Sequence, residues 1–239
     1  ATWSRTMTIN MATGFTNVTS LTITGAGRDA TIVNLKLGNY SKHIVFTGKD
    51  GKKFELTKIG FVYDTTETAY LIAIGGDIGK THPDTEGFRI HNCRFTGTNP
   101  TVASMNSMMI VDATAYGLVD NNEFYGVRIG YAGNSSSSPM TQKQDPAYSS
   151  AAGLGTAAFN VFVENNYFVG NGPTKYTEMI DSYGAGKYVV RYNSIVNSYV
   201  MTHGGCPNGC RGARAFEVYN NDFATNTNLP RAVNRPAFF

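Results

Sequence analysis

VFVENNYF (161–168) and YVVRYNSI (188–195) align residue by residue, and four other segments of the chain share their pattern. Those segments are FELTKIGF (54–61), FRIHNCRF (88–95), GLVDNNEF (117–124) and FEVYNNDF (216–223). The first and third columns of the alignment are apolar or Gly, the sixth is Asn in four segments, and the eighth is Phe or Ile. Self-similarity at a recurring spacing is typical of a repeat architecture.

The sixth-column residues follow one another at intervals of 34, 29, 44, 27 and 28 residues. A unit of 27 to 29 residues therefore carries insertions, and the longest coincides with a Ser-rich stretch at 132–158. We expect a loop there, because connections of that length are usually either functional or without fixed structure. The repeat covers most of the chain, so we expect one domain over 1–239.

Apolar residues alternate within each repeat, which predicts strands rather than helices. No segment shows a convincing amphipathic helix, so equivalent strands must pair with their copies in the neighbouring coils. The expected fold is an all-β, right-handed parallel β-helix of about seven to eight coils. Two explanations together account for the Asn column: Asn tolerates the left-handed conformation of a sharp turn, and stacked Asn side chains form a hydrogen-bonded ladder. The Phe column predicts an inward aromatic stack.

The composition excludes two classes of function. Charged residues make up 15% of the 239 residues and the formal net charge is +3, far from the basic stripe of a nucleic-acid-binding protein. No apolar run approaches the roughly 18 residues that a membrane span requires. We therefore expect neither a nucleic-acid partner nor a membrane span.

The opening ATWSRTMTI (1–9), followed by LTITGAG (21–27) and TIV (31–33), resembles the first coils of parallel β-helix proteins of the pectate-lyase-like superfamily. The Asn-x-Phe coils resemble the same superfamily, so the similarity covers nearly the whole chain. It implies a right-handed parallel β-helix and a role among polysaccharide lyases, glycoside hydrolases, epimerases, phage tailspikes or surface proteins. The Ca-binding Asp cluster and the Arg-x-Pro-x-x-Arg pattern of pectate lyases are absent from the sequence, so no cofactor is expected on the strength of a motif.

Between the aligned segments lies a second set of strand-like runs, and polar residues end several of them. These are Asp112, Tyr131, Asp181, Tyr183 and His203. If 181 and 203 occupy equivalent places in successive coils, their side chains lie about 5 Å apart, the spacing of paired strands. An Asp beside a His can orient the imidazole for acid–base catalysis.

Two arginines follow this set and complete the expected site. Arg211 and Arg214 could bind a substrate carboxylate or stabilise an enolate-like intermediate. The expected catalytic residues are thus Asp181, His203, Tyr131 and Arg211, with Arg214, Asp112 and Tyr183 binding substrate. Glycoside hydrolysis would instead need two carboxylates, for which Asp112 and Asp181 are candidates. The alternative interpretation is that Asp181 and His203 are ordinary turn residues.

The chain has three Cys residues, too few for a disulfide framework. Cys206 and Cys210 bracket a Pro-Asn-Gly turn, so we expect a disulfide between them and an oxidising compartment. Half of a metal site is the weaker alternative, since no second Cys or His pair stands at ligand spacing. Cys93 falls in the Asn column and is expected to be a small buried side chain.

Two functions fit these observations. The first is an extracellular, carbohydrate-active protein that cleaves or binds an acidic polysaccharide. The second is a non-catalytic surface or assembly protein, such as a phage-spike-like module or a filament subunit. Unpaired strands at the ends of a β-helix invite end-to-end pairing, so a homo-oligomer is an expected partner state in the second case.

Overall fold

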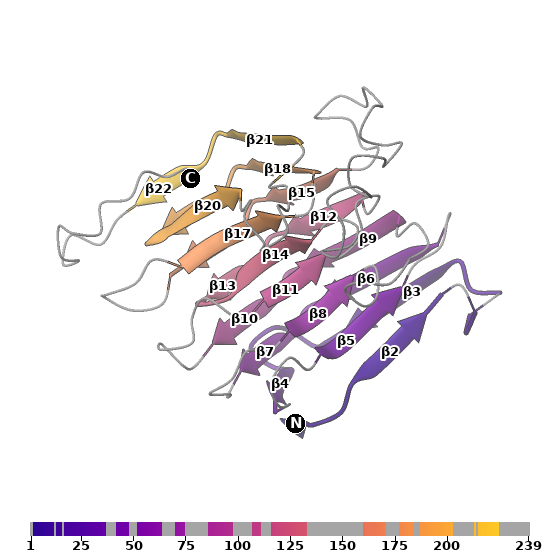
Figure 1. Cartoon of the computed structure of the whole chain (residues 1–239). Helices are drawn as coiled ribbons and strands as arrows, with labels where there is room; N and C mark the ends of the chain where they lie inside the picture. Colours follow the sequence, from indigo (N-terminus) through magenta and orange to yellow (C-terminus); the bar gives the residue numbers. More distant parts are fainter. Residues whose placement is uncertain are drawn as a thin grey trace, which may run out of the picture.

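The computed structural model describes residues 2–11, 13–15, 17–36, 42–47, 52–63, 70–74, 86–97, 107–110, 116–132, 160–170, 177–183, 187–202, 213 and 215–224. These residues form 22 strands in three sheets, which we call A, B and C. Figure 1 shows the strands stacked in chain order from the N-terminus to the C-terminal coils.

Sheet A contains β1 (Thr2–Trp3), β4 (Ile32–Leu35), β7 (Gly60–Tyr63), β10 (Arg94–Gly97), β13 (Glu123–Tyr125), β16 (Tyr167–Val169), β19 (Ser194–Val196) and β22 (Asp222–Ala224). Sheet B contains β2 (Met7–Asn10), β5 (Lys42–Thr47), β8 (Tyr70–Ile74), β11 (Ser107–Ile110), β14 (Arg128–Ala132), β17 (Thr177–Tyr183) and β20 (Ser198–Thr202). Sheet C contains β3 (Ser20–Thr24), β6 (Lys53–Thr57), β9 (Glu86–His91), β12 (Tyr116–Asp120), β15 (Val161–Glu164), β18 (Lys187–Arg191) and β21 (Ala215–Tyr219).

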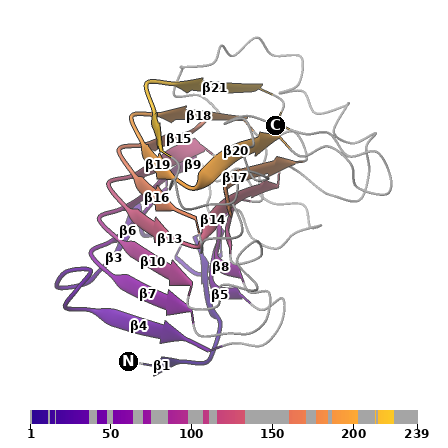
Figure 2. The ribbon, with the colours of Figure 1, turned by 90° about the vertical axis from the view of Figure 1, so that its left-hand side faces the viewer.

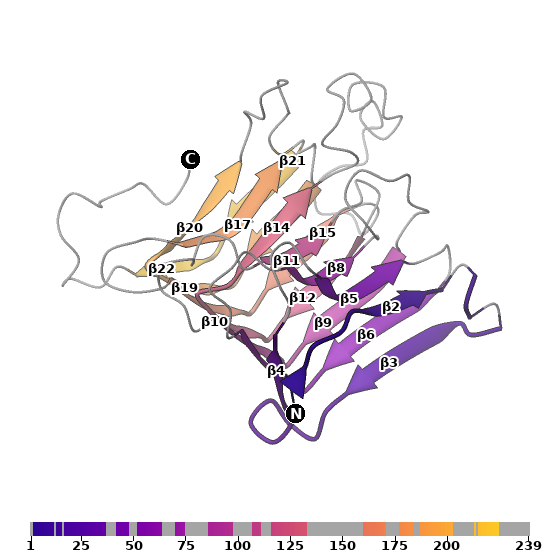
Figure 3. The ribbon, with the colours of Figure 1, turned by 60° about the horizontal axis from the view of Figure 1, so that its bottom comes forward.

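The chain visits the sheets in a fixed order, A then B then C, and then returns to A one level higher. Apart from the strands at the two ends of each sheet, each strand pairs in parallel with the strand three places before it and the strand three places after it, as β13 does with β10 and β16. Figure 2 shows the sheet A strands as a stack, and Figure 3 shows the three sheets enclosing one interior. The fold is a β-solenoid, and sheets of eight, seven and seven strands confirm the expected number of coils.

The aligned segment that recurs in the sequence is two strands joined at a sharp corner. In VFVENNYF, β15 ends at Glu164, Asn165 and Asn166 make the corner, and β16 begins at Tyr167. Asn165 has φ 56°, in the left-handed region. The same conformation occurs in the fifth column of every aligned segment, at Lys58, Asn92, Asn121, Asn165, Tyr192 and Asn220. We call this edge of the solenoid the C–A corner.

The two roles expected of one Asn column are divided between two columns. The fifth-column residue turns the chain, and the sixth-column Asn forms the ladder. The Asn166 backbone N–H donates to Asn193 Oδ1 at 3.0 Å, and Asn166 Oδ1 accepts from the Asn122 backbone N–H at 3.0 Å. Asn166 Nδ2 also donates to the Val119 carbonyl at 2.8 Å. The ladder continues to Asn221, so these amides bond successive coils together inside the protein.

The interior is filled by the columns that the sequence predicts to point inward. Phe61, Phe95, Phe124 and Phe168 stack in order, with ring centroids 5.4, 5.0 and 4.5 Å apart. The first-column Gly117 leaves room for a neighbouring ring, because a Cβ there would lie 2.5 Å from Phe88. The last coil differs, since the inward-facing Phe216 stacks on Tyr188 at 5.9 Å yet remains 46% exposed.

Candidate functional site

The outer face of sheet B carries Asp181, the best-placed of the expected catalytic residues. Asp181 lies in β17, where the strand register sets it opposite Gly130 of β14 and Met201 of β20. Residues beside these in the sequence, Ile129 and Val200, belong to the core. Because side chains alternate along a strand, Asp181 belongs to the outward row.

A β-bulge in β17 changes which side chains share this outer face. The register with β20 pairs Glu178 with Tyr199 and Ile180 with Val200, so Met179 is the extra residue. Met179 and Ile180 are both buried in the core. Strict alternation would place residues 178 and 181 on opposite faces, but the bulge puts Glu178 and Asp181 on the same one.

Four side chains from three coils meet at this bulge, and we call them the Arg128 cluster. Arg128 Nη1 lies 2.7 Å from Asp181 Oδ2 and 3.5 Å from Glu178 Oε2. The Tyr199 hydroxyl donates to Glu178 Oε1 at 2.7 Å. One guanidinium thus bridges two carboxylates, and the second carboxylate also accepts from a phenol.

The Arg128 cluster is unusually buried for the outer face of a solenoid. The side chain of Asp181 is 4% exposed, and those of Arg128 and Glu178 are 14% exposed. The pKa of Tyr188, a core residue, is well above its usual range. The larger cause is burial of the phenol, and the smaller is the nearby negative charge of Asp181. Burying ions is expensive even when they pair, so a cluster of this kind marks a candidate functional site.

The chemistry available at the cluster is acid–base chemistry with a fixed cation. Two carboxylates and a phenol can accept and donate protons, and Arg128 partly offsets the carboxylate charge. Arg128 touches both carboxylates and is held by them, so it would act as a positioning residue. Within the described residues no group of three His, Cys, Asp or Glu side chains could hold a metal ion.

The strand register places two more of the expected site residues near Asp181. Tyr131 lies opposite Ile110 of β11 and Ser182 of β17, in the row next to that of Asp181. Tyr183 ends β17, opposite Ala132 and two residues beyond Asp181. These backbone positions put both tyrosines within one or two residues of Asp181 along sheet B.

The remaining predicted residues lie outside the described part of the chain. These are Asp112, His203, Arg211, Arg214 and the Cys206–Cys210 pair. The register sets Met201 opposite Asp181, so His203 is two residues beyond the position directly beside it. The contact between Asp181 and His203 stays a prediction, as does the disulfide. The long loop expected at 132–158 also falls outside the description, except for Ala132 at the end of β14.

Sequence reasoning missed Arg128, Glu178 and Tyr199. Their neighbours in GVRIGYAG, TEMIDSYG and YVMTHGG were visible as second-set strands, but alternation alone could not pair residue 178 with residue 181. The available signal was the separation of Glu178 and Asp181, two charged residues three positions apart in one expected strand. In a solenoid, such a pair requires either one buried charge or a bulge.

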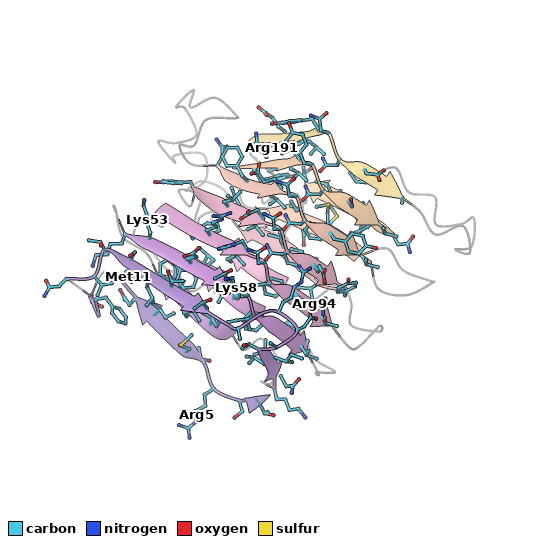
Figure 4. All side chains as sticks on the ribbon, turned by 180° about the vertical axis from the view of Figure 1, so that it is seen from behind. Arg5, Met11, Lys53, Lys58, Arg94 and Arg191 are labelled. Carbon is cyan, nitrogen blue, oxygen red and sulfur yellow. The ribbon has the colours of Figure 1, made fainter. Side chains whose placement is uncertain are left out.

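Sheet C carries a second set of charges on its outer face, and we call it the sheet C charge ladder. Its pairs join neighbouring coils, Arg89 with Asp120 (2.9 and 2.7 Å), His91 with Glu55 (2.7 Å) and Arg191 with Glu164 (2.6 Å). In Figure 4, Lys53 begins β6, Lys58 follows the end of β6 at the C–A corner, and Arg191 ends β18 nearer the C-terminus. Each of these three pairs joins one coil to the next, which suits the ladder for holding coils together.

Cys93 behaves as expected for a small buried side chain. It is fully buried, its thiol lies 3.4 Å from the His91 carbonyl, and burial raises its pKa to about 12. Among the residues that the structure describes, no helix is long and apolar enough to cross a bilayer.

Comparisons with known proteins give no relative for this chain. No protein-family model matches it, no curated protein is significantly similar in sequence, and no solved structure is significantly similar to it.

Proposed function

We propose that this is an extracellular carbohydrate-active β-helix protein of the pectate-lyase-like kind, which cleaves an acidic polysaccharide lying along the outer face of sheet B. The observation that carries the proposal is the Arg128 cluster. A bulge that breaks the repeat brings two carboxylates, a guanidinium and a phenol together on one face, and bulges are over-represented next to active sites.

The proposed roles follow from the chemistry of a uronic-acid polymer. A lyase must remove the proton next to the sugar carboxylate, while a cation stabilises the enolate-like charge that develops. Asp181 is the proposed base or the group that orients His203 as the base. Arg211 and Arg214 are the proposed cations for the substrate carboxylate, because Arg128 is already bound by Asp181 and Glu178.

The test is a panel of acidic polysaccharides: polygalacturonate, alginate and hyaluronan. We expect unsaturated products, seen as rising ultraviolet absorbance, on one of them. Asp181→Asn should lower that rate at least about 100-fold, the scale of general acid–base catalysis. Glu164→Gln, an equivalent change in the sheet C charge ladder, should leave it within about twofold, and circular dichroism would check that both variants fold. Equal rates for the two variants would remove Asp181 from the site.

A second function, end-to-end assembly, is favoured by one observation. Phe216 faces inward at the last described coil, yet 46% of it is exposed, so the apolar interior is open there. A second copy stacked on that coil would cover it. Sedimentation velocity over a range of concentrations tests this. Assembly that grows with concentration and is lost in Phe216→Ser, together with no product from any polysaccharide, would favour the assembly function over catalysis.

A further inference from the structure

A polar groove runs along the C–A corner, on the other side of the solenoid from sheet B. It has a volume of about 480 Å³. Its floor is the Asn ladder, represented by Asn122 and Asn166, and its walls include Glu123 and the exposed residues of the corner itself. Figure 4 labels Lys58 and Arg94, which lie at the N-terminal end of this corner.

The row of corner residues in the groove repeats at the spacing of the coils. Asn92, Asn121, Asn165 and Tyr192 occupy the same left-handed position in four successive coils, and all are exposed. Successive coils lie about 4.8 Å apart, so the row spans three steps, about 14 Å. A linear polymer whose units repeat at a similar distance could place one unit on each coil.

The three Asn side chains have hydrogen-bonding capacity to spare. Asn121 Nδ2 donates to Asp120 Oδ2 at 2.7 Å, and Asn92 Nδ2 lies 2.7 Å from His91 Nδ1. Among the described residues, no hydrogen bond uses the Oδ1 atom of either side chain or either amide atom of Asn165. Amides with open donors and acceptors are suited to pairs of sugar hydroxyls.

Tyr192 is the residue that sets this corner apart. It has φ 58° and is 52% exposed, while the equivalent residue in four of the other five aligned segments is Asn. A bulky side chain in the left-handed region is a genuine outlier, and such strain collects at ligand-binding positions. Its ring meets that of Tyr219 edge-on, with centroids 6.2 Å apart, and its centroid lies 5.8 Å from the Arg191 guanidinium carbon.

A second exposed ring, Tyr167, lines the same groove one coil earlier. It is 39% exposed and meets Tyr125 edge-on at 6.1 Å. Two tyrosines beside a row of amides offer the combination that sugars need, an apolar ring face for stacking and polar groups for the hydroxyls.

The charges at the groove point to a neutral ligand. Arg28 Nη2 lies 2.7 Å from Glu123 Oε1, and Arg94 Nε donates to Glu123 Oε2 at 2.6 Å. Arg94 also pairs with Asp29. Among the described residues that line the groove, Arg28 is the one cation and Glu123 neutralises it, so the lining offers no unpaired cation to a polyanion.

We infer that the C–A corner groove binds a neutral linear polysaccharide, with Tyr192 and Tyr167 stacking on sugar rings and Asn92, Asn121 and Asn165 binding hydroxyls. The site is separate from the Arg128 cluster and does not depend on the proposed catalysis. A protein with both sites would hold a neutral glycan at the corner while it acts on an acidic one at sheet B.

Isothermal titration calorimetry with cellohexaose, mannohexaose, xylohexaose and (1→4)-linked galactohexaose tests the inference, with hexagalacturonate as the acidic counter-probe. We expect one neutral hexasaccharide to bind with a Kd below about 1 mM. Tyr192→Asn restores the residue most common in this column and removes the ring, and it should weaken binding at least tenfold. Asn165→Gly keeps the left-handed backbone and removes the amide, and it should weaken binding severalfold.

Asn220→Gly is the matched control, since it makes the same change at the same corner position outside the groove. It should leave the Kd unchanged, and none of the three variants should melt at a clearly lower temperature than the wild-type protein. Binding that survives both Tyr192→Asn and Asn165→Gly would overturn the site. No binding of any neutral hexasaccharide, or binding of hexagalacturonate alone, would overturn the ligand class. Neither result bears on polysaccharide cleavage, which is measured separately with the Asp181→Asn variant.

Discussion

The C–A corner and the outer face of sheet B are made by the same coils, but the corner repeats regularly from coil to coil and sheet B does not. At the corner each coil repeats the one before it: a left-handed residue, an Asn bonded to the next Asn, and then a stacked ring. On sheet B a bulge interrupts the repeat and buries two carboxylates with an arginine. The comparison teaches that the buried part of the repeat stabilises the fold, and that ligands should be sought where exposed side chains repeat at the coil spacing or where a bulge breaks the repeat.

The largest effect should come from removing the cation of the Arg128 cluster. Arg128→Met leaves two buried carboxylates facing each other, so the free energy of unfolding should fall by about 3–5 kcal/mol. Urea denaturation followed by circular dichroism measures it. Arg191→Met, the matched change in the more exposed sheet C charge ladder, should cost only about 1 kcal/mol. Equal losses would show that the two faces do not differ in this way.

The second prediction concerns two adjacent asparagines at one corner. Asn166→Ala removes the partners of the buried Asn122 N–H and Val119 carbonyl, which should cost about 2–4 kcal/mol of unfolding free energy. Asn165→Gly, one residue earlier, keeps the left-handed backbone and should change stability by only a few tenths of a kcal/mol. The same urea titrations measure the free energy of unfolding of both variants. A similar loss of unfolding free energy in the two would contradict the division of roles between the two columns.

The third prediction tests whether Tyr192 is strained. Tyr192→Asn relieves a left-handed conformation that costs about 1–2 kcal/mol, and it loses ring contacts worth about 0.5–1.5 kcal/mol. We therefore expect a small net gain, about 0.5 kcal/mol, seen as a slightly higher melting temperature. Asn220→Tyr, the reverse change at the equivalent position, should be destabilising. A clear loss of stability in Tyr192→Asn would mean that the ring is present to stabilise the fold.

The smallest effect is a pH dependence in the sheet C charge ladder. Hydrogen bonds from His91 and then Thr22 lower the pKa of Glu55 below its usual 4.5. A carboxylate whose pKa is lower in the folded state contributes stability above pH 4.5 and loses it as the pH falls through the folded value. Because the Glu55 side chain is 38% exposed, the contribution should stay below about 0.5 kcal/mol.

Urea denaturation of the wild-type protein and of Glu55→Gln, repeated at several pH values, measures this contribution. The series runs from about pH 3 to about pH 6, where carboxylates titrate. The difference between the two proteins should shrink as the pH falls. A difference that stays constant over the range would mean that Glu55 gains nothing from its folded partners.

Much of the interior could be predicted from the sequence because it is periodic. Alternation identified Phe54, Leu56, Val161 and Val163 as inward, and all four are buried. The Asn column predicted the ladder and the Phe column predicted the stack. The corner was predicted only in part, since the left-handed residue is the fifth in each segment and the ladder Asn is the sixth. Both columns are rich in Asn, so composition alone could not separate the two roles.

The candidate site was less predictable. Asp181 stood out in the sequence as an acidic residue near the end of a second-set strand, and the structure buries it in an ionic cluster. Its partner Arg128 did not stand out because their contact depends on the register between two coils, and Glu178 did not because it needs one extra residue, Met179, in the strand. A bulge leaves no period-2 signature, and in a strand as short as β17 it cannot be told from ordinary variation.

The sequence by itself determined the β-solenoid, its coils, its ladder and its core, because each of these repeats a local pattern that neighbouring coils must satisfy in the same way. Only the tertiary structure decided which charges meet across coils, that Tyr192 stands exposed in a left-handed corner, and that Glu178 joins Asp181. The physical reason is that a repeat is written into each coil separately. A contact between side chains of different coils depends on register, and one inserted residue moves every later side chain of the strand to the other face.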